Sequence, residues 1–155
     1  MKIRGEKVFV REVVEVEICR ADASRSLKLK VCGVPVGFHR EYEAMFPKPQ
    51  PPSTTINRAG KDPEVKKNWD DPKYVALYEE WAFLEKFYTL YHCLAVDTSV
   101  SFESKADSPD ALRALVKEFK DAGFSEGDVG QIIEAINKAT VISPKAIEEA
   151  KADFA

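Results

Sequence analysis

A tract of four prolines within six residues, Pro47-Lys48-Pro49-Gln50-Pro51-Pro52, constrains the fold of this chain more than any other feature of its sequence. Proline fixes φ and lacks a backbone N–H, so the tract is excluded from helix interiors and central strands and favours extended polyproline II. The next residues, 53–68, are polar, contain Gly60 and Pro63, and show no helical or strand periodicity. We therefore expect residues 47–69 to form an extended arm, with a simple linker as the alternative.

The residues before the tract have the pattern of a β-hairpin. Apolar and polar residues alternate over Val14–Ile18 and again over Leu27–Val31, and the polar residues 20–26 lie between them. This pattern predicts two half-buried antiparallel strands. Because a two-stranded hairpin is marginally stable alone, its apolar face must pack on the downstream helices or on another chain. Phe38–Phe46 is long enough for one or two helical turns.

A long helix is predicted after the arm, from Pro72 to about Ala95. Asp70 or Asp71 can cap it, and proline is favoured at the first helical position. Its apolar residues form two stripes, which is typical of a helix at the centre of a bundle or at an interface. The stripes contain Tyr74, Leu77, Tyr78, Trp81, Leu84, Tyr88 and Tyr91, and Phe83, Phe87, Leu90 and Leu94.

Three shorter helices are predicted in the rest of the chain. The first begins at Ser108-Pro109 and ends at Gly123, and the second begins at a capping box formed by Ser125 and Asp128. The third begins at Ser143-Pro144, which repeats the signal of Ser108-Pro109. Between the long helix and these three, residues 96–102 are rich in β-branched side chains and could be an extended segment or a third strand.

Together these patterns predict an α+β fold. Its parts are an N-terminal antiparallel β-hairpin or small sheet, a proline-rich arm and a C-terminal bundle of about four helices. The expected regions are residues 1–46, 47–69 and 70–155, with the β element and the helices packed as one unit.

Composition and charge exclude several classes of protein. No apolar run is long enough to span a bilayer, and the N-terminus lacks the apolar core of a secretory signal. Three cysteines form no framework of disulfides, which suits a reducing cytoplasm. Residues 1–70 carry 14 basic and 10 acidic side chains, but Glu12, Glu15 and Glu17 interrupt the basic positions. A nucleic-acid partner is therefore not expected.

The search for reactive groups gives no catalytic or metal-binding motif. The sequence has two histidines, His39 and His92, and lacks HExxH, CxxC and a glycine-rich phosphate loop. Adjacent carboxylates such as Glu79 and Glu80 diverge by about 100° on a helix, so they form no acid–base dyad. We expect neither enzymatic activity nor a cofactor. The proline arm, the strand-rich start and the Tyr/Trp-rich helix instead favour a protein that binds other proteins.

Several stretches resemble the tail assembly chaperones of long-tailed bacteriophages. They are Pro47–Pro52, Asp70-Asp71-Pro72-Lys73-Tyr74 at the start of an aromatic helix, Gly123–Asp128 and Ile147–Phe154. The resemblance implies a non-enzymatic protein of the host cytoplasm. It would coat the tape measure protein, help to recruit tail tube subunits and leave before the particle is complete. Apart from the resemblance, the aromatic helix has more apolar surface than one short bundle would cover, so a homo-oligomer is also expected. The partner-binding residues that the resemblance implies are Pro47, Pro49, Pro51, Pro52, Tyr74, Tyr78, Trp81 and Tyr88.

Other functions fit the same sequence. A structural virion or adaptor protein would use the hairpin edge and the arm to hold its neighbours and would stay in the particle. A small inhibitor would bind one host protein. An unrecognised enzyme would place a polar pocket around His39 or His92.

Overall fold

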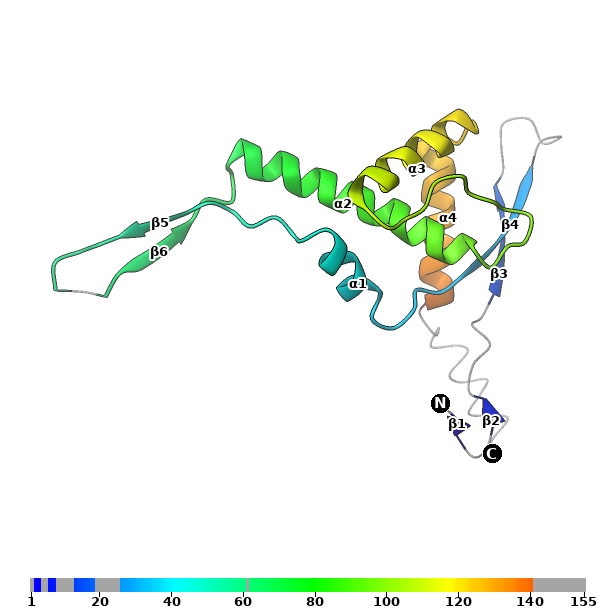
Figure 1. The fold of residues 1–155 in the computed structure, drawn as a ribbon, viewed down its shortest axis with the longest axis horizontal. Coiled ribbons are helices and arrows are strands. Elements are labelled where there is room, and N and C mark those ends of the chain that lie inside the picture. Colours follow the sequence, from blue (N-terminus) through cyan, green and yellow to red (C-terminus); the bar gives the residue numbers. More distant parts are fainter. Residues whose placement is uncertain (1, 4–5, 8–12, 19–25, 61, 141–155) are drawn as a thin grey trace.

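The computed structural model describes residues 2–3, 6–7, 13–18, 26–60 and 62–140. In these residues a β-hairpin lies against crossing helices, and a second hairpin projects from the far end of the longest helix (Figure 1). The predicted α+β architecture is therefore confirmed. A further small pair, β1 (Lys2–Ile3) and β2 (Glu6–Lys7), lies near the N-terminus. The helix predicted from Ser143 lies outside the described residues.

The predicted N-terminal hairpin is present. Strand β3 (Val13–Ile18) pairs antiparallel with β4 (Leu27–Cys32), with Val14 opposite Val31 and Val16 opposite Leu29. This apolar face packs against the helices, as a marginal two-stranded sheet requires. The other face places Glu15 and Glu17 opposite lysines, and Lys28 Nζ lies 3.8 Å from the Glu15 carboxylate.

The helices begin where the sequence places their caps. Helix α2 (Pro72–Leu94) begins after Asp71, whose side chain accepts a hydrogen bond from Tyr74 N at 2.9 Å. Helix α3 (Pro109–Asp121) begins after Ser108, and Gly123 beyond its end has φ +81°. Helix α4 (Glu126–Thr140) begins at a reciprocal capping box: Ser125 N donates to the Asp128 carboxylate, and Asp128 N donates to Ser125 Oγ.

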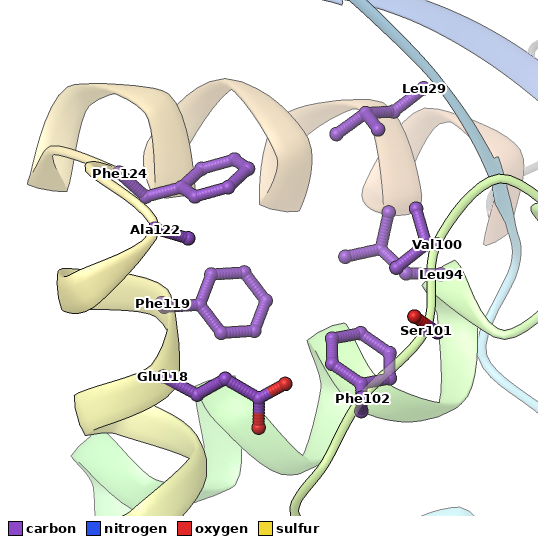
Figure 2. A pocket seen from close by; sticks show the side chains of 9 residues that line it. All are labelled: Leu29, Leu94, Val100, Ser101, Phe102, Glu118, Phe119, Ala122 and Phe124. Carbon is purple, nitrogen blue, oxygen red and sulfur yellow. The ribbon is translucent and has the colours of Figure 1, made fainter.

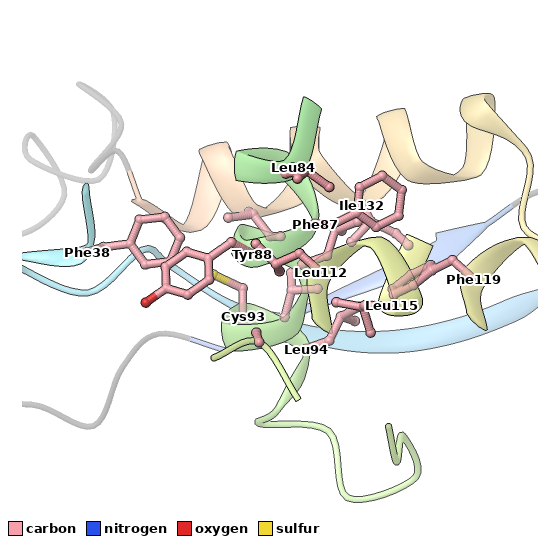
Figure 3. Close-up of a cluster of buried hydrophobic side chains, with 14 of the residues drawn as sticks. Phe38, Leu84, Phe87, Tyr88, Cys93, Leu94, Leu112, Leu115, Phe119 and Ile132 are labelled. Atoms are coloured by element: carbon pink, nitrogen blue, oxygen red, sulfur yellow. The ribbon is translucent and has the colours of Figure 1, made fainter. Parts of the chain in front are cut away.

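Helices and hairpin share one hydrophobic core (Figure 3). The inner half of α2 lies at its centre and supplies Leu84, Phe87, Tyr88, Leu90 and Leu94. Buried partners come from every side: Ile18, Leu29 and Val31 from the strands, Phe38 and Tyr42 from α1 (Phe38–Met45), Leu112, Leu115 and Phe119 from α3, and Ile132 and Ile136 from α4. Cys93 is buried in this core, as expected of a small apolar side chain.

Two segments differ from the sequence prediction. Residues 53–68 were expected to lack regular structure, but β5 (Ser53–Ile56) and β6 (Glu64–Lys67) form a second antiparallel hairpin. Of the two alternatives for residues 96–102, the third strand is not formed: residues 96, 98 and 99 lie in turns and the others have no regular secondary structure. There the buried Asp97 carboxylate accepts hydrogen bonds from Lys30 N, Ser99 N and Ser99 Oγ at 2.7, 2.9 and 2.6 Å. Asp97 thus ties this loop to the backbone of β4.

Candidate protein-binding surface

The arm, residues 47–69, extends from the body beside the first turns of α2 (Figure 1). Its base is held by Lys48, whose Nζ lies 5.5 Å from the ring centroids of both Tyr78 and Trp81. Of the four prolines, Pro51 is buried, Pro49 is half-buried, and Pro47 and Pro52 are exposed. The proline tract therefore turns one side towards the protein and leaves the other side accessible.

Aromatic rings form a continuous row from the arm into the core. Trp69 contacts Tyr74, Tyr74 contacts Tyr78, and Tyr78 stacks on Trp81, with centroid separations of 5.9, 6.0 and 6.0 Å. Tyr42 of α1 then bridges Trp81 to Tyr88 at 5.2 and 5.3 Å. The row thus joins the four aromatic residues predicted to bind a partner, Tyr74, Tyr78, Trp81 and Tyr88.

The inner end of this row is part of the core. Trp81 and Tyr88 are 6% and 5% exposed, and Trp81 Nε1 donates to Phe46 O at 2.8 Å. Tyr42 is fully buried and its hydroxyl donates to Trp81 O at 2.6 Å. Burial raises the pKa of Tyr42 and of Tyr88 above the ordinary value, so both hydroxyls stay protonated. Trp81 and Tyr88 therefore lie too deep to form the outer contact surface themselves.

The outer end of the row is accessible. Trp69 is 58% exposed and Tyr78 is 37% exposed. Leu77 is 52% exposed on the same outer half of α2, residues 72–80, and Val75 is also exposed. Large apolar side chains gathered on a projecting element commonly mark a protein-binding surface. We call these exposed side chains, Val65, Trp69, Val75, Leu77 and Tyr78, the outer apolar surface. Val75 and Leu77 lie about 160° apart around α2, so this surface extends around the helix and is not confined to one face.

The hairpin at the end of the arm is solvated on both faces. Ser53, Thr55, Val65 and Lys67 lie on one face, and Thr54, Ile56, Glu64 and Lys66 lie on the other. All of these except Ile56 are exposed. Arg58 pairs with Glu64 at 3.8 Å, and Lys67 Nζ lies 5.7 Å from the Trp69 ring centroid. Such a hairpin has little apolar burial of its own to stabilise it.

Within the described body, one small cavity is almost entirely apolar. It has a volume of about 110 Å³ and lies between the 94–102 segment, α3 and β4 (Figure 2). Phe102, Phe119 and Phe124 line it, and Glu118 at its edge accepts hydrogen bonds from Glu103 N and Ser104 N at 2.8 and 3.0 Å. The cavity is therefore a gap in the packing, next to the loop that Glu118 holds through hydrogen bonds to Glu103 N and Ser104 N.

The two histidines lie apart from this cavity. His39 Nδ1 lies 2.8 Å from Glu85 Oε1 at the surface, and His92 packs edge-on against Phe38, Tyr88 and Tyr91. No group of three or more His, Cys, Asp or Glu side chains that could hold a metal is present in the described part of the chain.

Of the outer apolar surface, the sequence analysis named only Tyr78 as a partner-binding residue; it missed Trp69 and also the neighbouring Lys48. Trp69 stands just before the Asp70-Asp71 cap, where a large aromatic residue cannot belong to the helical stripe. Lys48 is a single cation between prolines, and a cation held next to a predicted aromatic stripe is a signal of cation–π contact. The contacts of Trp69 and Lys48 with α2 could be predicted only if the arm were already known to run beside that helix.

Comparisons with known proteins give no match to a family model, a curated protein or a solved structure. No helix among the described residues is both long and apolar enough to cross a membrane.

Proposed function

We propose that this protein is a non-enzymatic assembly protein that binds another polypeptide through its arm and the outer apolar surface. The observation that carries the proposal is the uneven burial of α2: the same aromatic row is buried at Trp81 and exposed at Tyr78 and Trp69. An exposed apolar surface costs free energy in water, and a partner that covers it recovers that free energy.

The architecture supports binding at the end of the molecule. The body is closed around its own core, whereas the arm and outer half of α2 extend beyond it (Figure 1). Trp and Tyr are the residues most often found at the energetic centre of protein interfaces. An arm of this kind can lie along an elongated partner without rearrangement of the body.

More specifically, we propose a phage tail assembly chaperone that binds the tape measure protein and helps to recruit tail tube subunits in the host cytoplasm. This step rests on the sequence resemblance described above. A chaperone of this kind needs apolar contact surface and no reactive groups, in keeping with the outer apolar surface. A homo-oligomer could present several such surfaces to one long partner.

The test is co-expression with a tape measure protein and a tail tube protein, followed by affinity purification. The double variant Trp69→Glu/Leu77→Glu places charges on the outer apolar surface and is expected to lose the complex. The matched control is Val13→Glu on β3, because Val13 is also an exposed apolar residue, at 41%. The control is expected to keep the complex. Failure of the native chain to bind either tail protein would remove the chaperone proposal.

A second candidate is a structural adaptor that remains in the particle. The solvated β5–β6 hairpin favours it, because strands with open edges can add to a neighbour's sheet. Mass spectrometry of purified particles separates the two functions: an adaptor is present at stoichiometric amounts, and a chaperone is absent.

A further inference from the structure

The segment that carries the arm away from the body has very little conformational freedom. Every residue of 46–52 is either a proline or the residue directly before one. Proline fixes its own φ, and its ring excludes the helical region for the residue before it. Phe46, with φ −132° and ψ 93°, has the extended conformation that this requires. Residues 46–52, which we call the proline segment, are therefore stiff, and their direction depends on contacts near the start of the segment.

Two contacts hold that start against the helices. The first is at Phe46, whose N–H donates to Tyr42 O and whose carbonyl accepts from Trp81 Nε1, both at 2.8 Å. The second is at Lys48, whose Nζ lies 5.5 Å from the ring centroids of both Tyr78 and Trp81. A stiff segment attached at one point can still pivot about that point. The second contact, at Lys48, is therefore the one that selects its direction.

The burial of the proline segment fits this arrangement. Three residues complete one turn of a polyproline II helix, so Lys48 and Pro51 lie on the same side of it. Pro51 is buried, whereas Pro47 and Gln50, which share another side, are exposed. The side that carries the Lys48 ammonium is therefore the side that faces the protein, and the segment runs beside α2 towards the hairpin (Figure 1).

The returning chain couples the hairpin to the proline segment. Asn68 N donates to Pro52 O at 2.9 Å, which joins the two chain directions at the base of β5 and β6. The next residue, Trp69, packs edge-on against Tyr74 of α2 at a centroid separation of 5.9 Å. Because the hairpin is joined to the end of a stiff segment, its orientation follows the direction of that segment.

We propose that Lys48 is a positioning residue: its contact with Tyr78 and Trp81 holds the proline segment along α2 and thereby fixes the orientation of the β5–β6 hairpin. The attraction is that of an ammonium for the electron-rich faces of aromatic rings. The arm and the outer half of α2 then form one preorganised surface, so a partner spends less free energy on ordering the arm. The consequence for binding rests on the function proposed above, whereas the orientation of the arm does not.

Backbone ¹⁵N relaxation of the full chain measures whether the arm is held. In the native protein, the amides of Thr54, Thr55 and Val65 are expected to have order parameters close to those of α2, about 0.85. Lys48→Met removes the ammonium and keeps an unbranched side chain, and it is expected to lower these values below about 0.6. Lys48 is exposed, so the thermal midpoint of the variant should be nearly unchanged.

Two further variants separate the contact of Lys48 from general effects of charge. Lys48→Arg keeps a cation that can lie over aromatic rings, so it is expected to retain the native order parameters. Lys66→Met removes a lysine from the exposed strand β6 and is expected to change nothing. The proposal would be overturned by a mobile hairpin in the native chain, by equal order parameters in the native chain and Lys48→Met, by an equal loss in Lys66→Met, or by a mobile hairpin in Lys48→Arg.

Binding supplies a separate readout. Lys48→Met is expected to weaken the complex with the tail protein several-fold, and Lys66→Met is expected to leave it unchanged. An affinity that stays the same although the hairpin has become mobile would overturn the positioning role of Lys48. A native chain that binds neither tail protein would remove the chaperone proposal alone, because the relaxation measurement needs no partner.

Discussion

At the scale of single residues, Asp97 is the clearest case of a polar group that the fold depends on. Its carboxylate is buried and accepts three hydrogen bonds, one of them from the backbone of β4. Hydrogen bonds from Ser99 and Lys30 lower the pKa of Asp97, because they stabilise the ionised form. A charged side chain thereby helps to fix the loop after α2 to the hairpin, in addition to the packing of Val96 and Val100 against the core.

We expect Asp97→Asn to destabilise the protein by about 1–3 kcal/mol at neutral pH, because its amide N–H₂ would face the Lys30 or Ser99 donors. The folded-state pKa is lowered, so the stabilisation by the carboxylate is complete above its ordinary value of 3.8 and is lost as the pH falls below it. Urea unfolding of both proteins from pH 7 to pH 3 measures this. A difference in stability that stays constant across that range would contradict the assignment.

The two tryptophans make a matched pair with opposite expected behaviour. Trp81 is buried and bonded to Phe46 O, so Trp81→Ala should cost about 3–5 kcal/mol in stability. Trp69 is 58% exposed, so Trp69→Ala should change stability by less than about 0.5 kcal/mol while weakening the proposed complex. Urea midpoints of the two variants measure the contrast, and equal losses would show that the aromatic row is buried or exposed as a unit.

At the scale of elements, the sequence predicted what is encoded locally. The caps of α2, α3 and α4 are short-range patterns, and side chains such as Asp71 and Ser108 make the predicted bonds. The β3–β4 hairpin was predicted because one of its faces is buried, which forces alternation. The β5–β6 hairpin was missed for the converse reason: Ser53–Ile56 and Glu64–Lys67 bury neither face, so no alternation marks them.

The binding surface could be predicted only in part. Tyr78 and Trp81 belong to one stripe of α2, and helical periodicity gives no reason to separate them. Their burial differs because α1 and the start of the arm cover Trp81 but leave Tyr78 and Leu77 accessible. That distinction depends on contacts between residues 35 to 39 positions apart in sequence, which local patterns do not contain.

Two glycines differ in how much space surrounds them: Gly33, just after β4, is packed against the end of α4, and Gly130 within α4 is not. A Cβ at Gly33 would lie 2.8 Å from Ala139 O, a backbone atom, so Gly33→Ala should destabilise the protein by about 1–3 kcal/mol. A Cβ at Gly130 in α4 meets nothing within 4 Å, so Gly130→Ala should stabilise it by up to about 1 kcal/mol through helix propensity. Thermal unfolding measures both, and a neutral Gly33→Ala would mean that the end of α4 moves freely against β4.

At the scale of the whole molecule, folding and binding are assigned to different parts. The body contains the shared core, and the hairpin at the end of the arm is connected to it through residues 52 and 68, where Asn68 N donates to Pro52 O at 2.9 Å. In a four-residue β-turn, the N–H of the last residue donates to the C=O of the first residue in the same way. Residues 53–67 can therefore be replaced by Asn-Gly, a pair that favours a tight two-residue turn, without loss of the bond.

We expect the free energy of unfolding of this shortened chain to differ from that of the full chain by no more than about 0.5 kcal/mol, so its thermal midpoint should be nearly unchanged. The reason is that every described residue of β5 and β6 except Ile56 is exposed. Binding should respond differently from stability. Loss of the tail-protein complex with an unchanged midpoint would place part of the interface on the hairpin, and a retained complex would confine it to Trp69 and the outer half of α2. A large fall in the midpoint would instead make the hairpin part of the folding unit and would contradict this division of the molecule.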